Sequence, residues 1–314
     1  MKVFVLAPQE DWICDRLTSE WYEFFPEFST KNPYEADIIW ILAGWCWNQI
    51  PQNLLRSKKV VVTEHHIVPE KFSVQKLNDF LFRDQFVDAY HVPSNKTREQ
   101  ISSLTNKTIL NTPFWVNDKI WKQLDRKNAR QDLNLSQDKF LVGSFQRDTE
   151  GSDLKSPKME KGPDIFVNHV DNLRKKIENV HVLLAGWRRQ YVMNELNKLN
   201  IPYTYFELPD LKVINQLYNA LDLYVVGSRY EGGPQSIFEC ALTKTPIVST
   251  DVGIARSILS EKCILREMSK EDYIPSEKDI EYAYQNVKNL LIDSHKNVYI
   301  KFFKDLNEGK FDKC

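Results

Sequence analysis

The chain has 314 residues, of which 42 % are hydrophobic and 27 % are charged, and this is the composition of a globular protein and not of a disordered one. That length is about twice that of an ordinary domain, so two domains are expected. The 42 basic and 43 acidic residues give a formal net charge of −1, which argues against a nucleic-acid-binding protein.

The cysteines and the apolar runs indicate the compartment of the protein and whether it has a membrane-spanning segment. Five cysteines are spread widely along the chain and form no CxxC pair, so no zinc site is expected. Reduced thiols in a cytosol-like compartment are the simplest interpretation, so we expect a cytoplasmic protein. The apolar run at the N-terminus is too short for a signal peptide, and the run at 38–47 is too short to cross a bilayer. We therefore expect no transmembrane segment.

The first half alternates short apolar runs with amphipathic segments. The runs predict five β-strands, at 3–7, 38–42, 60–63, 89–92 and 108–110. Helices are expected between them, including one at 12–25 and one at 96–104. Strands that alternate with helices are typical of βαβ units and a parallel sheet.

A charged segment at 117–139 has few apolar residues and separates two halves of different composition. Seven of the eight tryptophans lie in residues 1–121, and eight of the ten glycines lie in residues 143–253. We place the domain junction in this segment. The expected division is an N-terminal domain at 1–120, a linker at 121–138, a C-terminal domain at 139–291, and a terminal helix at about 292–314 that can pack back on the first domain.

The second half repeats the alternation of strands and helices. Strands are predicted at 140–144, 180–185, 203–206, 223–226 and 247–249. Helices are predicted at 163–176, 190–199, 211–220 and 234–244, followed by one or two terminal helices within 278–306. Both halves are thus expected to be α/β domains with parallel sheets. Ligands of such open sheets bind beyond the carboxyl ends of the strands.

The most informative segment follows the apolar run at 223–226 and reads Gly227-Ser-Arg-Tyr-Glu231-Gly-Gly-Pro-Gln-Ser-Ile-Phe-Glu239. Gly232 and Gly233 allow backbone angles that are closed to other residues, and they let a ligand approach the main chain. Pro234 suits the first position of a helix, whose amides and positive dipole end favour phosphate. Glu239 is expected on a helix face where it accepts hydrogen bonds from sugar hydroxyls. A strand-turn-helix junction with two solvated carboxylates is the alternative interpretation.

With its two glutamates eight positions apart, this segment resembles the E-x7-E signature of the family 4 retaining glycosyltransferases. The residues that follow also fit, with Thr245-Pro246-Ile247-Val248 and then Asp251-Val252-Gly253. The resemblance covers about residues 140–260 well and the first half weakly. It implies the GT-B fold, in which two Rossmann-like domains face a central cleft. It also implies that Glu231 contacts the transferred sugar and that Glu239 binds the ribose of the nucleotide.

The resemblance extends to a second segment, which follows the strand at 140–144. It implies that Arg147 and Lys161, the latter in a Lys-Gly pair, grip the diphosphate of the donor. Fixed cations stabilise the negative charge that a leaving diphosphate gains, so no metal is then needed. Gly143 is followed by Ser144 where the family has an arginine, and Arg147 arrives four positions after the glycine. Lys158 either contributes to this site or keeps the loop solvated.

Two further places match the family's donor pocket. Gly186, Arg188 and Arg189 follow the strand at 180–185, where an arginine either reaches a phosphate or caps the strand. In the first half, the strand at 60–63 leads to His65 and His66, and the family often has a histidine there, close to the donor sugar. Neighbouring side chains of an extended chain point to opposite sides, so one histidine is expected to face the cleft, and His66 is favoured.

The first half also departs from the family. The loop at 8–12 lacks the Gly-Gly turn that many members have, and the sequence does not decide whether this loop binds donor or acceptor. In the second half, Ile254 and Ser257 stand where the family commonly has a glycine and a glutamate. These departures concern the fine fit of the ligands and leave the predicted fold unchanged.

The resemblance implies transfer of a sugar from a UDP- or GDP-linked donor to a hydroxyl acceptor, with retention of the anomeric configuration and without a cofactor or metal. The acceptor is expected to be a carbohydrate, a lipid-linked molecule or a protein glycan. A nucleotide-sugar epimerase and a non-catalytic nucleotide-sugar-binding protein are the alternatives. A redox enzyme is disfavoured because no strand is followed by GxGxxG. The sugar, the base, the acceptor and a homodimeric state are left open.

Overall fold

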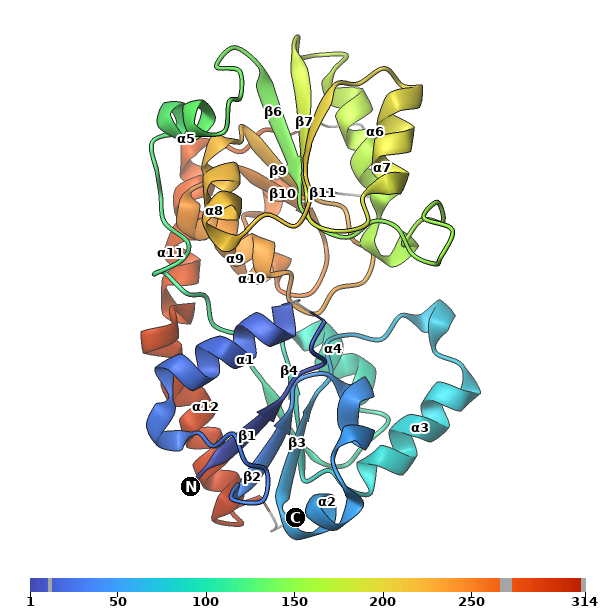
Figure 1. Ribbon diagram of the computed structural model, residues 1–314, viewed down its shortest axis with the longest axis vertical. Helices are drawn as coiled ribbons and strands as arrows, with labels where there is room; N and C mark the ends of the chain where they lie inside the picture. The colour runs from blue at the N-terminus through green and yellow to red at the C-terminus, as the bar shows by residue number, and fades with distance from the viewer. Residues whose placement is uncertain (11–12, 266–272, 312–314) are drawn as a thin grey trace. The chain divides into compact units, whose positions relative to one another are not determined.

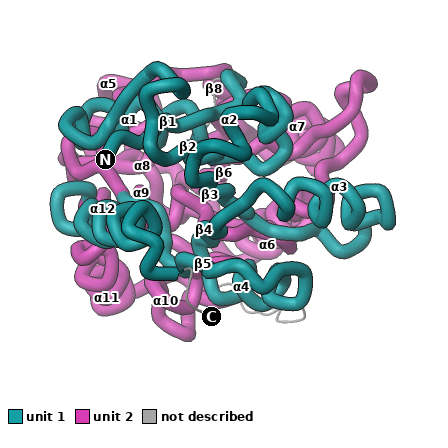
Figure 2. The backbone as a smooth tube through the Cα atoms, turned by 90° about the horizontal axis from the view of Figure 1, so that it is seen from below, with its two compact units in different colours: residues 1–115, 292–314 teal, residues 116–291 magenta. Residues whose placement is uncertain are grey.

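A computed structural model describes residues 1–10, 13–265 and 273–311. The chain forms two compact units, of which the first comprises Met1–Trp115 and Ile292–Cys314 and the second comprises Val116–Leu291 (Figure 2). Each unit contains a parallel sheet with helices packed against it (Figure 1). The predicted α/β class with two parallel sheets is therefore confirmed.

The sheet of the first unit has the strand order β1-β2-β3-β4-β5, and all neighbouring strands are parallel. Its strands are β1 (Val3–Leu6), β2 (Ile38–Ile41), β3 (Lys59–Thr63), β4 (Ala89–Val92) and β5 (Thr108–Asn111). Each strand falls on one of the predicted apolar runs. Alternate strand residues enter two separate cores, because successive side chains point to opposite faces of a sheet.

Helices cover both faces of this sheet. One core contains residues of α1 (Ile13–Phe24) and of the terminal helix α12 (Ile292–Asn307). The other contains residues of α2 (Gln52–Ser57), α3 (Val74–Asp84) and α4 (Asn95–Ile101). The expected helix at 12–25 thus begins at Ile13 in the described chain, since Trp12 and its neighbour Asp11 lie outside the described residues.

Helix α12 is held to the first unit by an aromatic core and by hydrogen bonds. The ring of Phe303 lies 5.6 Å from that of Trp21 and 5.3 Å from that of Trp40. The buried Tyr299 hydroxyl donates to the carbonyl oxygen of Pro113 at 3.0 Å and lies 3.1 Å from His91 Nε2. Burial lowers the pKa of His91 to about 3, so the imidazole is neutral at physiological pH. The last helix is therefore part of the first unit although it follows the second in sequence.

The sheet of the second unit has the order β11-β10-β9-β6-β7-β8 and is also parallel. Its strands are β6 (Phe140–Ser144), β7 (Val180–Ala185), β8 (Tyr203–Phe206), β9 (Leu223–Val226), β10 (Ile247–Thr250) and β11 (Ile264–Leu265). The chain runs outward from β6 to β8 and then returns to place β9 on the other side of β6. The strand order thus reverses between β6 and β9, which is where doubly wound sheets bind ligands.

Two layers of helices cover the second sheet. Helices α6 (Pro163–Leu173) and α7 (Gln190–Lys198) contribute to one core. Helices α8 (Leu211–Ala220), α9 (Gln235–Thr243), α10 (Ala255–Ile258) and α11 (Glu277–Val287) contribute to the other. The short strand β11 was not predicted, because two residues are too few to give an apolar run.

The segment 121–138, expected as a linker, lies within the second unit and contains helix α5 (Arg126–Asp132). Arg130 in this helix is only 4 % exposed. Its guanidinium donates to Asp222 Oδ2 at 2.6 Å and to the carbonyl oxygen of Ala220 at 2.9 Å. A charged residue of the predicted linker is thus buried against a carboxylate more than 90 positions away.

The cysteine thiols of the second unit and of α1 are structural groups. Cys14, Cys46, Cys240 and Cys263 are free and buried. Burial raises the pKa of Cys14 to about 12 and that of Cys263 to about 11, so neither forms the reactive thiolate at neutral pH.

Within the ranges that the structure describes, no three His, Cys, Asp or Glu side chains are grouped as metal ligands. In the same ranges, no helix has the length and apolar character that a bilayer crossing requires.

We predict that Tyr299→Phe lowers the free energy of unfolding of the protein by about 1 kcal/mol, because it leaves the buried Pro113 carbonyl without the tyrosine donor. Tyr34→Phe is the control, since Tyr34 lies in the same unit and is 62 % exposed. Urea denaturation of both variants checks the prediction. Equal stability of the two variants would show that the Tyr299 hydroxyl does not hold α12.

Candidate functional site

The candidate site is built from two loops that follow β6 and β9, at the point where the strand order reverses. The loop after β6 ends in the 3₁₀ helix Met159–Lys161, Gly162 and the first residue of α6. Gly162 is left-handed, with φ of 57°, and Pro163 stands at the start of α6, where its missing amide hydrogen costs nothing. The loop after β9 runs from Gly227 to Pro234 and leads into α9.

The backbones of these two loops are in direct contact. A Cβ atom at Gly162 would lie 1.7 Å from the carbonyl oxygen of Gly227, and one at Gly227 would lie 2.8 Å from the carbonyl oxygen of Gly162. Only glycine fits at both positions, and Gly162 also needs glycine for its left-handed conformation. The contact brings the end of one loop, Lys161, up to the other.

Lys161 and Glu231 form an ion pair across these loops, with Lys161 Nζ donating to Glu231 Oε1. Each side chain is only 14 % exposed. The Ser228 hydroxyl lies 3.5 Å from the same carboxylate oxygen. At such low exposure the two charges interact much more strongly than in water. The structure thus brings together two residues that the sequence analysis singled out in separate segments.

A second ion pair fastens the two loops together. Both guanidinium nitrogens of Arg229 donate to Asp164, each at 2.7 Å, in the bidentate geometry that is the strongest for this pair. The amides of Arg229 and Tyr230 donate to the carbonyl oxygen of Glu160 at 2.9 and 3.1 Å. The hydrogen bonds from Arg229 lower the pKa of Asp164, so this carboxylate stays charged at neutral pH. Sequence analysis missed this pair, since a single Arg and a single Asp in loops carry no local signal.

The glycines after Glu231 do not adopt the special backbone angles that glycine allows. Neither Gly232 nor Gly233 has a positive φ in the described chain. The left-handed residue is Gly253, with φ of 47°, and a Cβ atom there would lie 2.2 Å from the carbonyl oxygen of Gly232. Pro234 is the residue before the helix and not its first helical residue, and its carbonyl oxygen accepts from the amide of Ile237 at 3.0 Å.

Glu239 lies on α9 but faces the interior of the second unit. It is 5 % exposed, and Glu239 Oε2 accepts a hydrogen bond of 2.7 Å from the Tyr218 hydroxyl on α8. Every residue of α9 from Ile237 to Thr243 is buried. The helix face that carries Glu239 is therefore buried beside α8 and is not open to solvent. Burial raises the pKa of Tyr218 well above its ordinary value, so the phenol stays protonated and donates.

Arg147 makes contacts with its own loop and with the loop after β7. Its Nε donates to the carbonyl oxygen of Thr149 at 3.0 Å, and its guanidinium lies 5.5 Å from the centre of the Trp187 ring. Arg188 lies over the same ring at 4.4 Å and donates to the carbonyl oxygen of Gly151 at 3.0 Å. Gly186 begins this turn with φ of 94°. The structure therefore groups Arg147 with Arg188 around Trp187.

Arg189 has a different role from its neighbour Arg188. Its side chain is fully buried, and Nε donates to Asp148 Oδ2 at 2.6 Å. Its Nη1 donates to two carbonyl oxygens, that of Ser144 at the end of β6 and that of Ala185 at the end of β7. This guanidinium joins two strand ends from within the protein, so the expectation that Arg189 lines a donor pocket is wrong for the described conformation.

The remaining candidates have partners of their own. Lys158 lies 3.6 Å from a carboxylate oxygen of Glu160. In the first unit, His65 Nε2 lies 2.8 Å from the carbonyl oxygen of Leu42 and its ring stacks on Phe114. His65 is thus tied to the interior of its unit. His66, the favoured candidate, is half-buried.

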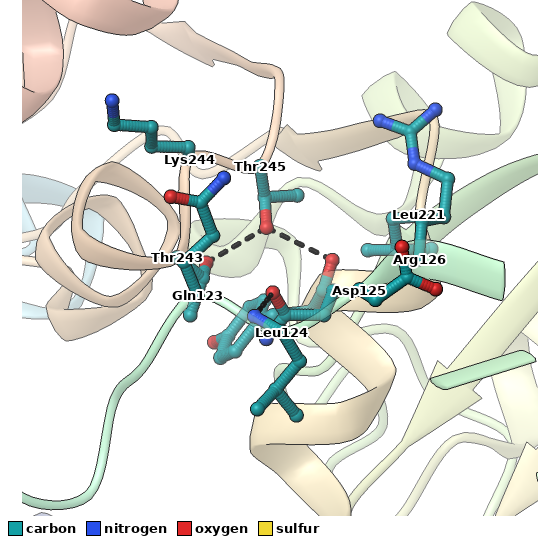
Figure 3. Close-up of a pocket in the computed structure, with 10 residues that line it drawn as sticks. Gln123, Leu124, Asp125, Arg126, Leu221, Thr243, Lys244 and Thr245 are labelled. Atoms are coloured by element: carbon teal, nitrogen blue, oxygen red, sulfur yellow. Dashed lines mark hydrogen bonds between the residues drawn. The ribbon is translucent and has the colours of Figure 1, made fainter. Parts of the chain in front are cut away.

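A hollow of about 470 Å³ lies elsewhere on the second unit, at the opposite end of α9 (Figure 3). Its lining is mostly polar and contains none of the predicted donor-site residues: Gln123, Leu124, Asp125, Arg126, Tyr218, Asn219, Leu221, Thr243, Lys244 and Thr245. The Thr243 and Thr245 hydroxyls lie 2.7 Å apart, and Thr245 also donates to the Tyr218 carbonyl oxygen at 2.9 Å. These hydroxyls stabilise the turn after α9.

The family-model match lies almost entirely in the second unit. Residues 153–293 match the family model of the group 1 glycosyl transferases. The chain is also similar to an uncharacterized glycosyltransferase of Methanocaldococcus jannaschii, at 24 % identity over 208 residues. That alignment covers 66 % of this chain and 46 % of the relative, so it spans less than half of the relative's length.

Solved structures of similar fold cover both units. HepE of Anabaena, crystallised with UDP and glucose, gives a TM-score of 0.75 at 14 % identity, over 98 % of this chain and 99 % of HepE. Sucrose-phosphate synthase of Thermosynechococcus elongatus gives a TM-score of 0.69 at 15 % identity, over 96 % of this chain and 80 % of that one. At these identities the likeness shows the fold, and the predicted GT-B fold is confirmed.

We predict that Gly162→Ala destabilises the protein by at least about 2 kcal/mol more than Gly151→Ala, because only the first adds a clash to the left-handed strain. Gly151 is a matched control, with φ of 76° and only the flexible Asp153 side chain within 3.4 Å of an added Cβ atom. Thermal unfolding measures the difference. Similar losses for the two variants would mean that the two loops are not in contact.

We also predict that Arg189→Met lowers the free energy of unfolding by about 3–5 kcal/mol, since it leaves the Asp148 carboxylate buried without its cation. Arg188→Met removes an exposed hydrogen bond and a ring contact and is expected to cost about 1 kcal/mol. Chemical denaturation of the two neighbouring variants tests this difference. A larger loss of unfolding free energy in Arg188→Met than in Arg189→Met would contradict the role of Arg189 as the buried partner of Asp148.

Proposed function

We propose that the protein transfers a sugar from a nucleoside-diphosphate sugar to a hydroxyl acceptor, because residues 153–293 match the family model of the group 1 glycosyl transferases. The observation that carries the proposal is the Lys161–Glu231 ion pair at the reversal of strand order in the second sheet. A cation and an acceptor of hydrogen bonds lie there side by side, which suits the phosphate and the sugar hydroxyls of such a donor.

In the proposed mechanism, Lys161 changes partner when the donor binds. Without ligand, its ammonium and the Glu231 carboxylate compensate each other. A diphosphate beside Lys161 would replace the carboxylate as its partner and leave Glu231 to accept hydrogen bonds from the sugar. As the bond to the sugar breaks, the diphosphate gains negative charge, which the fixed ammonium stabilises. The amides at the start of α9 would add to this stabilisation.

The proposed donor nucleotide is UDP or GDP. HepE and its UDP complexes motivate UDP as the first donor nucleotide to test, with GDP as the second. The resemblance to family 4 assigns Glu239 to the ribose. Glu239 is 5 % exposed and accepts from the Tyr218 hydroxyl, so the proposed ribose contact requires the nucleotide to displace the groups that cover this carboxylate.

We further propose that transfer retains the anomeric configuration and proceeds without a metal or a covalent enzyme intermediate. In this reaction the acceptor oxygen forms the new bond to the anomeric carbon while the bond to the diphosphate breaks on the same face. The departing phosphate takes the acceptor proton. His66 is proposed to contact the donor sugar, as the resemblance to family 4 implies for one of the two histidines. A carbohydrate, a lipid-linked molecule or a protein glycan is the proposed acceptor class.

Two other functions use the same donor site. An epimerase would interconvert two nucleotide sugars in the absence of an acceptor. A non-catalytic binding protein would bind the donor and turn over nothing. Incubation with donor alone, followed by separation of nucleotide sugars, distinguishes the first from a transferase. Donor hydrolysis or transfer to an added acceptor distinguishes the second.

We predict that UDP or GDP at ~100 times its dissociation constant stabilises the fold by about 2.7 kcal/mol, with or without EDTA. Lys161→Ala is expected to abolish most of this shift and to lower the rate of transfer by about 10²–10³-fold, because the charged hydrogen-bond partner of the leaving diphosphate is lost. The control is Lys158→Ala, which removes a lysine of the same loop that lies beside Glu160. This variant is expected to keep the ligand-induced shift and the rate of transfer.

Thermal shift of the three proteins, followed by a transfer assay, checks these outcomes. An unchanged ligand shift in Lys161→Ala would exclude this lysine from the donor site. A shift that disappears in EDTA would contradict the proposal that no metal is needed.

A further inference from the structure

Gln146 bridges the two loops of the candidate site through both ends of its side-chain amide. Gln146 Nε2 donates to the carbonyl oxygen of Lys161 at 2.7 Å. Gln146 Oε1 accepts from the Ser228 hydroxyl at 3.2 Å. Gln146 itself follows the carboxyl end of β6, and Ser228 follows that of β9. One side chain thus links the strand ends on either side of the reversal of strand order.

The chemistry of the partners fixes the orientation of this amide. A backbone carbonyl is only an acceptor, so the nitrogen of Gln146 must face Lys161. The oxygen then faces Ser228, which has a hydroxyl proton to donate. Ser228 is fully buried, and its own carbonyl oxygen accepts from Thr250 Oγ1 at 2.5 Å. The bridge is therefore anchored on a rigid part of the sheet edge.

We propose that Gln146 is a positioning residue that holds the backbone of Lys161 in place while the Lys161 ammonium exchanges Glu231 for the donor diphosphate. This inference rests on the proposed function. In that exchange the lysine side chain loses the partner that orients it in the ligand-free protein. The Gln146 bond acts on the carbonyl of the same residue and is independent of the ammonium's partner, so the backbone stays in register when the side chain moves.

The Ser228 hydroxyl connects Gln146 to Glu231, the carboxylate that Lys161 leaves when the donor binds. Its hydroxyl lies 3.2 Å from Gln146 Oε1 and 3.5 Å from Glu231 Oε1. The hydroxyl has one proton and two acceptors, so it donates to one of them at a time. When Lys161 moves to the diphosphate, the Glu231 oxygen loses its cation and becomes the stronger acceptor. Gln146 then depends on its bond to Lys161 alone.

The rest of this loop is held by other contacts, so the effect of Gln146 on nucleotide binding can be separated from an effect on stability. Arg229 holds the start of α6 through Asp164, and it also donates to the Met159 carbonyl oxygen at 3.1 Å. The close contact of Gly162 and Gly227 is independent of Gln146. Loss of the amide should therefore displace Lys161 without unfolding the loop.

The test is a double-mutant cycle on nucleotide affinity. Gln146→Met removes the donor and the acceptor at similar size and adds no charge. Gln137→Met is the matched control in the same unit, because Gln137 Nε2 also donates to a lysine carbonyl, that of Lys127, at 3.0 Å on the exposed surface. Dissociation constants for UDP and GDP are measured by calorimetry in the wild type, Lys161→Ala, Gln146→Met, Gln137→Met and the double variant Gln146→Met/Lys161→Ala.

We expect Gln146→Met to weaken nucleotide binding about tenfold and Gln137→Met to leave it unchanged. In the Lys161→Ala background, Gln146→Met is expected to have no further effect, since a positioning residue acts only through the group that it positions. A merely structural role would instead weaken binding equally in both backgrounds.

The outcomes separate this inference from the proposed function. If Lys161→Ala weakens binding and Gln146→Met either has no effect or adds its full effect to that of Lys161→Ala, the inference is wrong and the donor site stands. If Lys161→Ala binds both nucleotides as the wild type does, or the wild type binds neither, the proposed donor site itself is wrong. Ser228→Ala provides a second variant, for which a smaller loss than for Gln146→Met is expected because the bond to Lys161 is kept.

Discussion

The contact between the backbones of Gly162 and Gly227 is the constraint on which the rest of the candidate site depends. A side chain at either position would push the loops after β6 and β9 apart. With both glycines present, Lys161 comes within bonding reach of Glu231, and Arg229 comes within reach of Asp164. The charged groups are therefore brought together by the absence of two Cβ atoms, and the ion pairs then stabilise a geometry that the backbone has already defined.

The surroundings of this contact are rigid for reasons that differ from loop to loop. Behind the loop after β6, the Arg189–Asp148 pair joins the ends of β6 and β7 without any solvent. Behind the loop after β9, Gly253 packs against the carbonyl oxygens of Glu231 and Gly232. Buried charge pairs of this kind add little net stability but penalise alternative arrangements. This suits a site whose polar groups must be oriented before a ligand arrives.

Several basic residues that look equivalent in the sequence have separate tasks in the structure. Lys161 faces a carboxylate at the strand reversal, Arg147 and Arg188 lie over an exposed tryptophan ring, and Arg189 is an interior brace. This division leads the proposed mechanism to Lys161, while a contact of Arg147 or Arg188 with the diphosphate stays a prediction. It also shows why a count of cations near strand ends is a poor guide to a phosphate site.

The sequence by itself determined every strand of both sheets except the two-residue β11, because strands buried on both faces need continuous apolar runs. It also determined where α6 begins, since a proline at a helix start has a local cause. The E-x7-E segment pointed to Glu231 for the same reason, as a motif contained within one turn and one helix.

Only the tertiary structure decided which residue meets which. Arg188 and Arg189 have the same local preferences, and Asp148, 41 positions earlier, selects one of them for burial. Glu239 turns inward because Tyr218 on another helix donates to it, and the segment at 121–138 folds onto the second unit because Asp222 receives Arg130. Helix α12 likewise joins the first unit through residues near position 113. These outcomes depend on partners distant in the chain, and no local pattern of the sequence contains them.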